Sequence, residues 1–372
     1  MAEQYVMNLM RTMREHQNKE QNADTIVSES VVKTLRCPRC HEGLRLRNEH
    51  SSPNTAQQHL LCKHCQESFP IIDGIPRLLL PPLRDGLLGN GSALLTDDRQ
   101  IRTALSFGFE WSRFPEMYEE WHQSFLNYMQ PHDPTFFRGK RVLDAGCGSG
   151  RFAYYAAKYG AEVWAMDLGP AVEVARRNTE GAGNVQVVQA DLHCPPFALE
   201  SFDFIYSLGV LHHLPDPEPA FQNLLRFLKP GGEIQIYLYW DPEGQPLKSA
   251  MLSGIKAIRK ITTRLPHVAV HALAYPAAVA AFAGFVWPYQ VLRQFPGLKG
   301  LAERIPMKQY AGFPFRVCVN DQFDRLSAPI ENRYTRAAVA SWFERAGLEE
   351  LKISASYGWV GAARKPLDPV SF

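Results

Sequence analysis

The stretch Arg141–Gly150, read as RVLDAGCGSG, constrains the fold of this 372-residue chain more than any other. Its apolar start, residues 142–145, is typical of a buried parallel strand. A glycine-rich turn comes next, and residues 151–159 are predicted to form a helix. A strand, a glycine-rich turn and a helix in this order open a nucleotide-binding βαβ unit, where a ligand approaches bare backbone. The three glycines of the turn are Gly146, Gly148 and Gly150.

Two details of this stretch indicate which nucleotide it binds. The dinucleotide fingerprint has a glycine three residues after Gly148, and this chain has Arg151 there. The acid Asp144 stands two residues before the first glycine. A carboxylate repels a pyrophosphate but attracts a ligand that carries an ammonium and a sulfonium. S-adenosylmethionine (SAM) is such a ligand.

The sequence DAGCGSG resembles motif I of the class I SAM-dependent methyltransferases, in particular the type 11/12 group. The resemblance runs over residues 139–240 and resumes near 335, which is under half of the chain. It implies an α/β fold, a Rossmann-like sheet of seven strands, and SAM as the methyl donor. It says little about the methyl acceptor.

Further strands are predicted at 161–166, 184–190, 202–208 and 233–239, with a closing pair at 351–355 and 359–363. Asp167 ends the second strand, where an acid can accept both ribose hydroxyls; capping the helix that begins at Pro170 is the alternative. Asp191 ends the third strand, and by the resemblance it faces the adenine, with the Leu192 N–H on the ring. The cofactor-binding residues expected are Asp144, Gly146, Cys147, Gly148, Gly150, Asp167, Leu168, Asp191, Leu192 and Ser207.

The segment after the fourth strand contains the pair His212-His213. The Asn/Asp-Pro-Pro-Tyr/Phe loop of amine methyltransferases and the Pro-Cys pair of cytosine-C5 methyltransferases are absent there, whereas many small-molecule methyltransferases carry a His-His pair. A histidine of near-neutral pKa can accept a hydroxyl proton as the methyl group arrives. Packing of the following turn is the alternative role, and the sequence does not choose between the two histidines. No catalytic metal is predicted.

Two CxxC pairs, Cys37/Cys40 and Cys62/Cys65, stand 21 residues apart near the N-terminus. Four thiolates on two tight turns form the closed ligand set of a structural Zn²⁺ site; free thiols or disulfides are the alternatives. Residues 35–80 resemble the small Trm112-like zinc-ribbon domain, which occurs alone or fused to methyltransferases. Seven cysteines, four of them in these pairs, fit a reducing compartment, and we expect a cytoplasmic protein.

Five parts are expected along the chain. They are a polar tail (1–30), the ribbon (31–80), a linker with an aromatic helical segment (81–134), the methyltransferase domain (135–240 and 335–366) and the insertion (241–334). The segment 97–130 is predicted to be helical, and its many aromatic residues suit either a lid over the cofactor or ordinary packing. Residues 335–346 form an amphipathic helix between the N-cap Thr335 and Gly347.

The insertion should determine the substrate, because it follows the fifth strand on the acceptor side. Residues 247–265 are predicted to form a basic amphipathic helix, and 268–292 hold no charged residue. A buried helical lid is the favoured interpretation of 268–292; a membrane span or an interfacial helix pair are the alternatives. Residues 241–316 hold ten Lys/Arg against three Asp/Glu, although the whole chain carries a formal charge of only +2.

We therefore expect SAM-dependent methyl transfer to a small-molecule or lipid-like acceptor, at oxygen rather than nitrogen or carbon. The first alternative is an RNA methyltransferase that holds RNA with its ribbon and its basic insertion. The second is a non-catalytic SAM-binding partner protein. Peripheral membrane contact through the insertion is a further expectation, and the sequence leaves the oligomeric state open.

Overall fold

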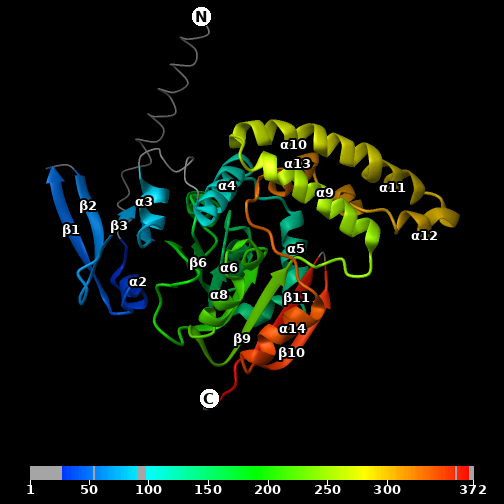
Figure 1. Ribbon diagram of the computed structural model, residues 1–372. Helices are drawn as coiled ribbons and strands as arrows, with labels where there is room; N and C mark the ends of the chain where they lie inside the picture. Colours follow the sequence, from blue (N-terminus) through cyan, green and yellow to red (C-terminus); the bar gives the residue numbers. More distant parts are fainter. Residues whose placement is uncertain (1–26, 53–54, 90–97, 357, 368–372) are drawn as a thin grey trace, which may run out of the picture.

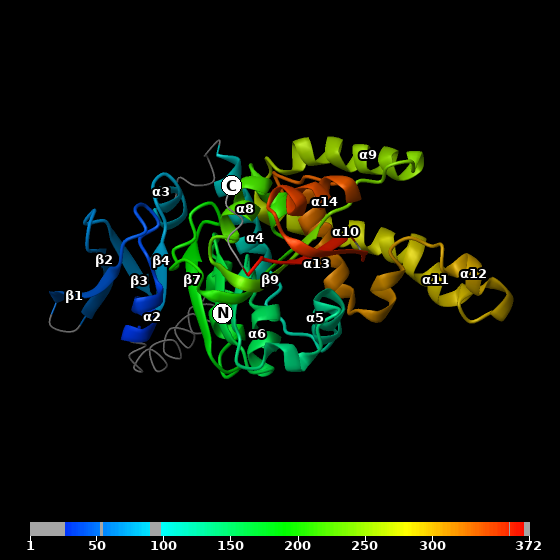
Figure 2. The same ribbon diagram turned by 90° about the horizontal axis from the view of Figure 1, so that it is seen from below.

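The computed structural model describes residues 27–52, 55–89, 98–356 and 358–367 (Figure 1). Its centre is one mixed sheet of eleven strands in the order β1-β2-β3-β4-β7-β6-β5-β8-β9-β11-β10. Two parts of the expected segments lie outside the described residues. They are residues 1–26 of the tail predicted at 1–30 and residues 90–97 of the linker segment. The ribbon is at one end of the molecule and the insertion at the other (Figures 1 and 2).

Seven of the eleven strands form the seven-strand unit that the sequence predicts. Its order is β7-β6-β5-β8-β9-β11-β10, with β5 to β9 parallel and β11 antiparallel to β9. The strands are β5 (Arg141–Ala145), β6 (Glu162–Asp167), β7 (Val185–Ala190), β8 (Phe202–Leu208), β9 (Leu228–Leu238), β10 (Glu349–Ala355) and β11 (Trp359–Arg364). The helices of this unit are α6 (Arg151–Lys158), α7 (Ala171–Asn178), η3 (Leu211–His213), α8 (Pro217–Leu224) and α14 (Arg336–Arg345).

The burial of these strands follows from their composition. The strands β5 to β8 read as nearly continuous apolar runs, and their side chains are buried on both faces, as parallel strands require. Trp164, Phe204 and Tyr206 are among the largest fully buried side chains. Thr335 caps α14 as predicted, by accepting a hydrogen bond from the Ala338 N–H at 3.1 Å, and Gly347 has a positive φ of 64°.

The other four strands belong to the ribbon. The sheet therefore has eleven strands, whereas the sequence predicted seven. The ribbon consists of α2 (Glu29–Thr34), β1 (Leu44–Ser52), β2 (Thr55–Cys62), β3 (Ser68–Ile72) and β4 (Ile75–Leu78). The last strand, β4, pairs in parallel with β7, with Arg77 opposite Gln189 and Leu78 opposite Ala190. The ribbon strands and the seven-strand unit form one sheet because the backbone N–H and C=O groups on the free edge of β7 pair with β4.

The predicted helical segment at 97–130 is two helices, α4 (Arg99–Arg113) and α5 (Glu120–Met129). The chain leaves the helical conformation at Phe114, the residue before Pro115, as expected for that position. The linker before them contains the short helix α3 (Leu83–Leu88), and η2 (Pro134–Phe137) leads into β5.

The insertion is helical throughout. Its elements are α9 (Pro246–Thr262), α10 (His267–Ala281), η4 (Phe282–Val286), α11 (Trp287–Leu292), η5 (Pro296–Leu298), α12 (Lys299–Ala302), η6 (Lys308–Gly312) and α13 (Phe315–Ser327). The elements α10, η4 and α11 form one helix, His267–Leu292, of which only 22% is buried in its most apolar window. The favoured prediction of a buried helical lid at 268–292 is therefore wrong, because only one side of this helix packs on the protein.

Candidate active site and metal centre

The glycine turn lies at the carboxyl end of β5, where α4 crosses it. Gly146, Gly148 and Gly150 have positive φ angles of 96°, 52° and 76°. A Cβ atom on Gly148 would lie 2.9 Å from Nε1 of Trp111, so this turn has no room for a side chain there. Trp111 packs on the turn, so both roles of the aromatic segment, a lid over the cofactor region and ordinary packing, stay open.

Two of the predicted cofactor acids lie beside this turn. Asp144 is buried at the end of β5 and accepts a hydrogen bond from the Tyr206 hydroxyl at 3.0 Å. Burial raises the pKa of Asp144 to about 7. Asp167 ends β6, and its two oxygens each accept a backbone hydrogen bond at 2.9 Å, one from the Gly148 N–H and one from the Gly169 N–H.

The third acid, Asp191, follows β7 and is already well bonded. Its Oδ1 accepts from the His193 backbone N–H at 3.0 Å and from Nε2 of Gln100 at 3.2 Å, and it also lies 2.9 Å from Nδ1 of His193. These bonds join α4 to the carboxyl end of β7. The assignment of Asp191 and Leu192 to adenine stays a prediction, as does every cofactor assignment made from the sequence.

Three other predicted residues have contacts within the fold. Cys147 is buried in the glycine turn, and the Leu168 carbonyl accepts a 2.8 Å hydrogen bond from Nε2 of Gln189. Ser207 is fully buried and donates to the Ala145 carbonyl at 2.8 Å, so its hydroxyl joins β8 to β5.

The His-His pair lies at the carboxyl end of β8, in η3, and the two histidines differ. The Nδ1 atom of His213 lies 2.6 Å from the Ile330 carbonyl. Because a carbonyl only accepts, Nδ1 carries the proton and the lone pair of the neutral ring is on Nε2. The ring of His212 is fully buried 3.8 Å from the ring of Tyr239, and neither of its nitrogens has a hydrogen-bond partner among the described residues.

The residues 143–236, which run from β5 into β9, match the family model described as a methyltransferase domain. This segment includes the glycine turn, the three acids and both histidines.

Residues 143–236 therefore carry a methyltransferase domain.

Curated relatives match the same domain. A ubiquinone biosynthesis O-methyltransferase of Proteus mirabilis is 34% identical over 113 residues, which are 29% of this chain and 45% of the relative. The corresponding protein of Idiomarina loihiensis is 33% identical over 150 residues, 38% of this chain and 57% of the relative. The chain thus spans about half the length of these relatives. A solved SAM-dependent methyltransferase of Aquifex aeolicus is 14% identical, with 69% of this chain and 96% of that chain covered and a TM-score of 0.37.

A buried polar cluster lies beside the methyltransferase domain, between α4 and α13. Glu110 and Asn320 are 2% and 5% exposed, and Asp324 follows Asn320 by one helical turn. Burial and the charge of Asp324 raise the pKa of Glu110, and a hydrogen bond with the Asn320 side chain opposes this rise. One oxygen of each of these three residues has no hydrogen-bond partner within the described chain. The Asn320 oxygen and an ionised carboxylate oxygen only accept hydrogen bonds, whereas Glu110 donates one when its carboxyl group is protonated.

Two further contacts connect the cluster to the rest of the site. The Tyr239 hydroxyl donates to Oδ2 of Asp324 at 3.2 Å, and the same tyrosine contacts His212. The guanidinium of Arg151, the first residue of α6, lies 4.8 Å from the ring centre of Trp111 and 4.2 Å from that of Trp121. The polar cluster thus contacts His212 through Tyr239, and the charge of Arg151, which follows the glycine turn, acts on Glu110.

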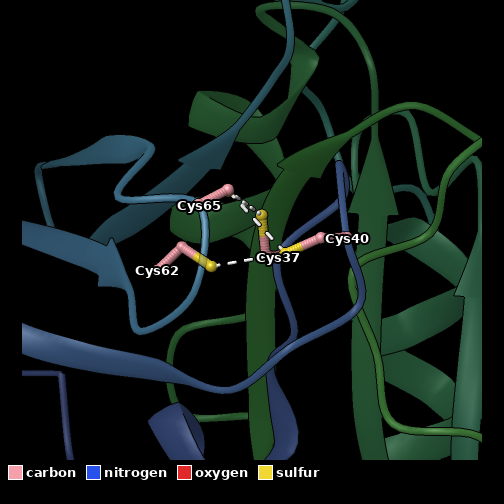
Figure 3. A group of neighbouring side chains, drawn as sticks. All are labelled: Cys37, Cys40, Cys62 and Cys65. Carbon is pink, nitrogen blue, oxygen red and sulfur yellow. Dashed lines mark hydrogen bonds between the residues drawn. The ribbon is translucent and has the colours of Figure 1, made fainter.

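The four cysteines of the two CxxC pairs converge in the ribbon, and their Sγ atoms all lie within 4.8 Å of one another (Figure 3). The Cys37–Cys65, Cys40–Cys62 and Cys40–Cys65 sulfur distances are 3.6, 3.5 and 3.7 Å. A tetrahedral ion with Zn–S bonds of about 2.3 Å separates its sulfurs by about 3.8 Å. The cysteines are not joined as disulfides. The four thiolates thus fit one zinc ion.

Sequence reasoning did not assign Glu110, Asn320, Asp324, Tyr239 or Gln100 to the site. A carboxylate in the middle of an aromatic helix, within FGFEWSRF, was the available signal for Glu110. Nothing in the sequence places Asn320 and Asp324 opposite it, because some 200 residues separate α13 from α4.

Proposed function

We propose that this protein transfers the methyl group of SAM to a hydroxyl group of a small-molecule or lipid-like acceptor. The observation that carries the proposal is the position of His213 within the matched domain. The Nε2 atom of its neutral ring has a lone pair that can accept a proton. The O-methyltransferases among the relatives support the choice of oxygen.

The cofactor side is assigned to the glycine turn and the acids around it. Asp144 attracts the cationic end of SAM when ionised. Asp167 keeps free lone pairs on both oxygens for the ribose hydroxyls, because each carboxylate oxygen can accept more than one hydrogen bond. SAM supplies the electrophilic methyl group.

On the acceptor side, the proposed reaction is a direct displacement. The acceptor oxygen forms a bond to the methyl carbon as the carbon–sulfur bond of SAM breaks, and the hydroxyl proton passes to Nε2 of His213. The Ile330 carbonyl fixes the ring in the tautomer this step needs. The unpartnered oxygens of Glu110, Asn320 and Asp324 suit an acceptor that brings several hydrogen-bond donors, such as neighbouring hydroxyl groups.

For the ribbon we propose a structural zinc ion held by Cys37, Cys40, Cys62 and Cys65. Four thiolates leave no open coordination position, so this ion stabilises the ribbon and takes no part in catalysis. Free thiols of this kind persist in the reducing cytoplasm, where we place the protein.

The test of the cofactor site is isothermal titration calorimetry with SAM. Asp167→Ala removes the proposed ribose acceptor, and we expect heat of binding from the wild-type protein and none from the variant. Asp203→Ala is the matched control, since Asp203 pairs with Lys229 at 2.7 Å outside the glycine turn. Unchanged SAM affinity in a folded Asp167→Ala protein would contradict the ribose assignment.

A further inference from the structure

The insertion carries most of the large apolar side chains that the protein exposes. Among the described residues, fourteen of the seventeen such side chains lie between positions 251 and 315. They are Met251, Ile258, Ile261, Leu265, Val268, Leu273, Tyr275, Val279, Trp287, Val291, Phe295, Leu298, Leu301 and Phe315. Single exposed apolar residues are normal on a protein surface, but a collection of this size on one segment marks an interaction surface.

The packing of α9 explains why its apolar residues are exposed. This helix contacts α13 and the following chain through polar groups: Arg259 pairs with Glu331 at 2.6 Å, and the Thr262 hydroxyl donates to the Leu326 carbonyl at 2.6 Å. Met251, Ile258 and Ile261 are about half exposed or more. These three apolar side chains are therefore not what attaches the helix to the protein.

The long helix His267–Leu292 is attached along one side only. Val270, Ala274 and Ala278 are buried at the spacing of one helix face, and this part packs on α13. Val286 is still fully buried, in the same apolar cluster as Tyr310 and Phe323, and beyond it α11 and α12 extend outward as an arm (Figures 1 and 2). By length and composition alone the helix is long and apolar enough to cross a membrane, and its most apolar 18-residue window has a mean hydropathy of 1.7.

The packing argues against a membrane span. The part of the helix beyond its last buried residue, Val286, is residues 287–292 and is about 9 Å long at 1.5 Å per residue. The hydrocarbon core of a bilayer is about 30 Å thick, so a span would require α10 to separate from α13. A position in the plane of a membrane surface requires no such separation.

The charge of the insertion indicates what kind of surface it binds. Residues 241–316 carry ten Lys/Arg and three Asp/Glu, and Lys256, Lys260 and Arg264 are exposed beside the apolar residues of α9. Apolar side chains enter the acyl region of a membrane, while adjacent cations attract anionic headgroups. We propose that the insertion docks the protein on the surface of an anionic lipid bilayer.

The helices of this docking surface pack on α13, the helix that also contributes to the polar cluster. The helix α13 packs against α10 and α9, and it presents Asn320 and Asp324 toward Glu110. If the proposed methyl transfer holds, a lipid-like acceptor has a short path from the bilayer to the site. The docking itself does not depend on that function.

The test is cosedimentation of the full-length protein with vesicles of phosphatidylcholine and phosphatidylglycerol, and with vesicles of phosphatidylcholine alone. We expect binding to the anionic vesicles that weakens as salt is raised. The triple variant Trp287→Ser/Val291→Ser/Phe295→Ser should reduce this binding at least about tenfold, because three exposed apolar anchors are lost. Replacing Lys256, Lys260 and Arg264 by Gln should remove the preference for anionic lipid.

The control is Leu199→Ser, because Leu199 and Trp287 are both 57% exposed and Leu199 lies outside the insertion. This variant should bind as the wild type does, and thermal unfolding should show that every variant is folded. Three results would overturn the proposal. They are no binding to anionic vesicles, self-association of the protein through the same residues without vesicle binding, and membrane attachment that only detergent releases.

Discussion

The ribbon and the insertion are both attached to the seven-strand unit, at opposite ends of the molecule, and the contacts that attach them differ (Figure 1). The ribbon joins by main-chain pairing of β4 with β7. It buries Arg77, whose guanidinium donates to Gln189 at 3.1 Å and pairs with Glu173. The insertion joins by packing of its helix α13 on α4 and keeps a large apolar surface exposed.

This difference indicates different tasks for the two regions. In the ribbon, the cysteines converge on one another, and the last strand and the buried arginine pair with the seven-strand unit. These groups therefore all have partners once zinc is bound. The insertion has apolar groups that no part of the described chain covers, and it therefore needs an outside surface. By our proposals, the part that resembles a separate domain has a structural role, whereas the insertion carries the interaction.

The largest effect is expected from Cys37→Ser. The change removes one of four thiolates, and a ribbon of some fifty residues has too small a core to stay folded without its metal. We expect loss of zinc by inductively coupled plasma mass spectrometry and loss of the ribbon's protection in hydrogen exchange. Cys194→Ser, at a cysteine outside the cluster, should keep its zinc; a Cys37→Ser protein with full zinc content would exclude ligation by four thiolates.

A smaller effect is expected from Arg77→Met at the junction of ribbon and domain. The change leaves the buried Gln189 oxygen without its donor, which should lower the free energy of unfolding by about 2 kcal/mol. Urea unfolding measures this difference. Arg84→Met breaks the more exposed 2.7 Å pair with Glu67 and should cost less than about 1 kcal/mol. Equal losses in the two variants would show that Arg77 does not hold the junction.

The sequence predicted the parts of the fold that local pattern determines. The glycine turn, the five parallel strands and the capped helix after Thr335 depend on residues close together in the chain, and the structure has them near the predicted positions. The four cysteines also meet as predicted, because each pair forms a tight turn and only one further contact brings the turns together.

The rest depended on contacts between distant segments. The apolar run at 268–292 has the same composition whether protein covers it or not, so the sequence could not show that most of it is not buried. The pairing of β4 with β7 and the meeting of Glu110 with Asn320 join residues more than 100 positions apart. The sequence also treats His212 and His213 alike, whereas in the structure the Ile330 carbonyl beside His213 and the unpartnered ring nitrogens of His212 distinguish them.

The most direct test of the proposed methyl transfer is incubation of the purified protein with cell extract and SAM labelled in its methyl group, followed by mass spectrometry of the organic, aqueous and RNA fractions. We predict label in a hydroxyl-derived methyl ether of the organic or small-molecule fraction, and its loss with His213→Gln. Label confined to RNA would contradict the account and turn the basic insertion into an RNA-binding surface. Absence of label from every fraction, with SAM still bound, would indicate a partner protein that does not catalyse methyl transfer.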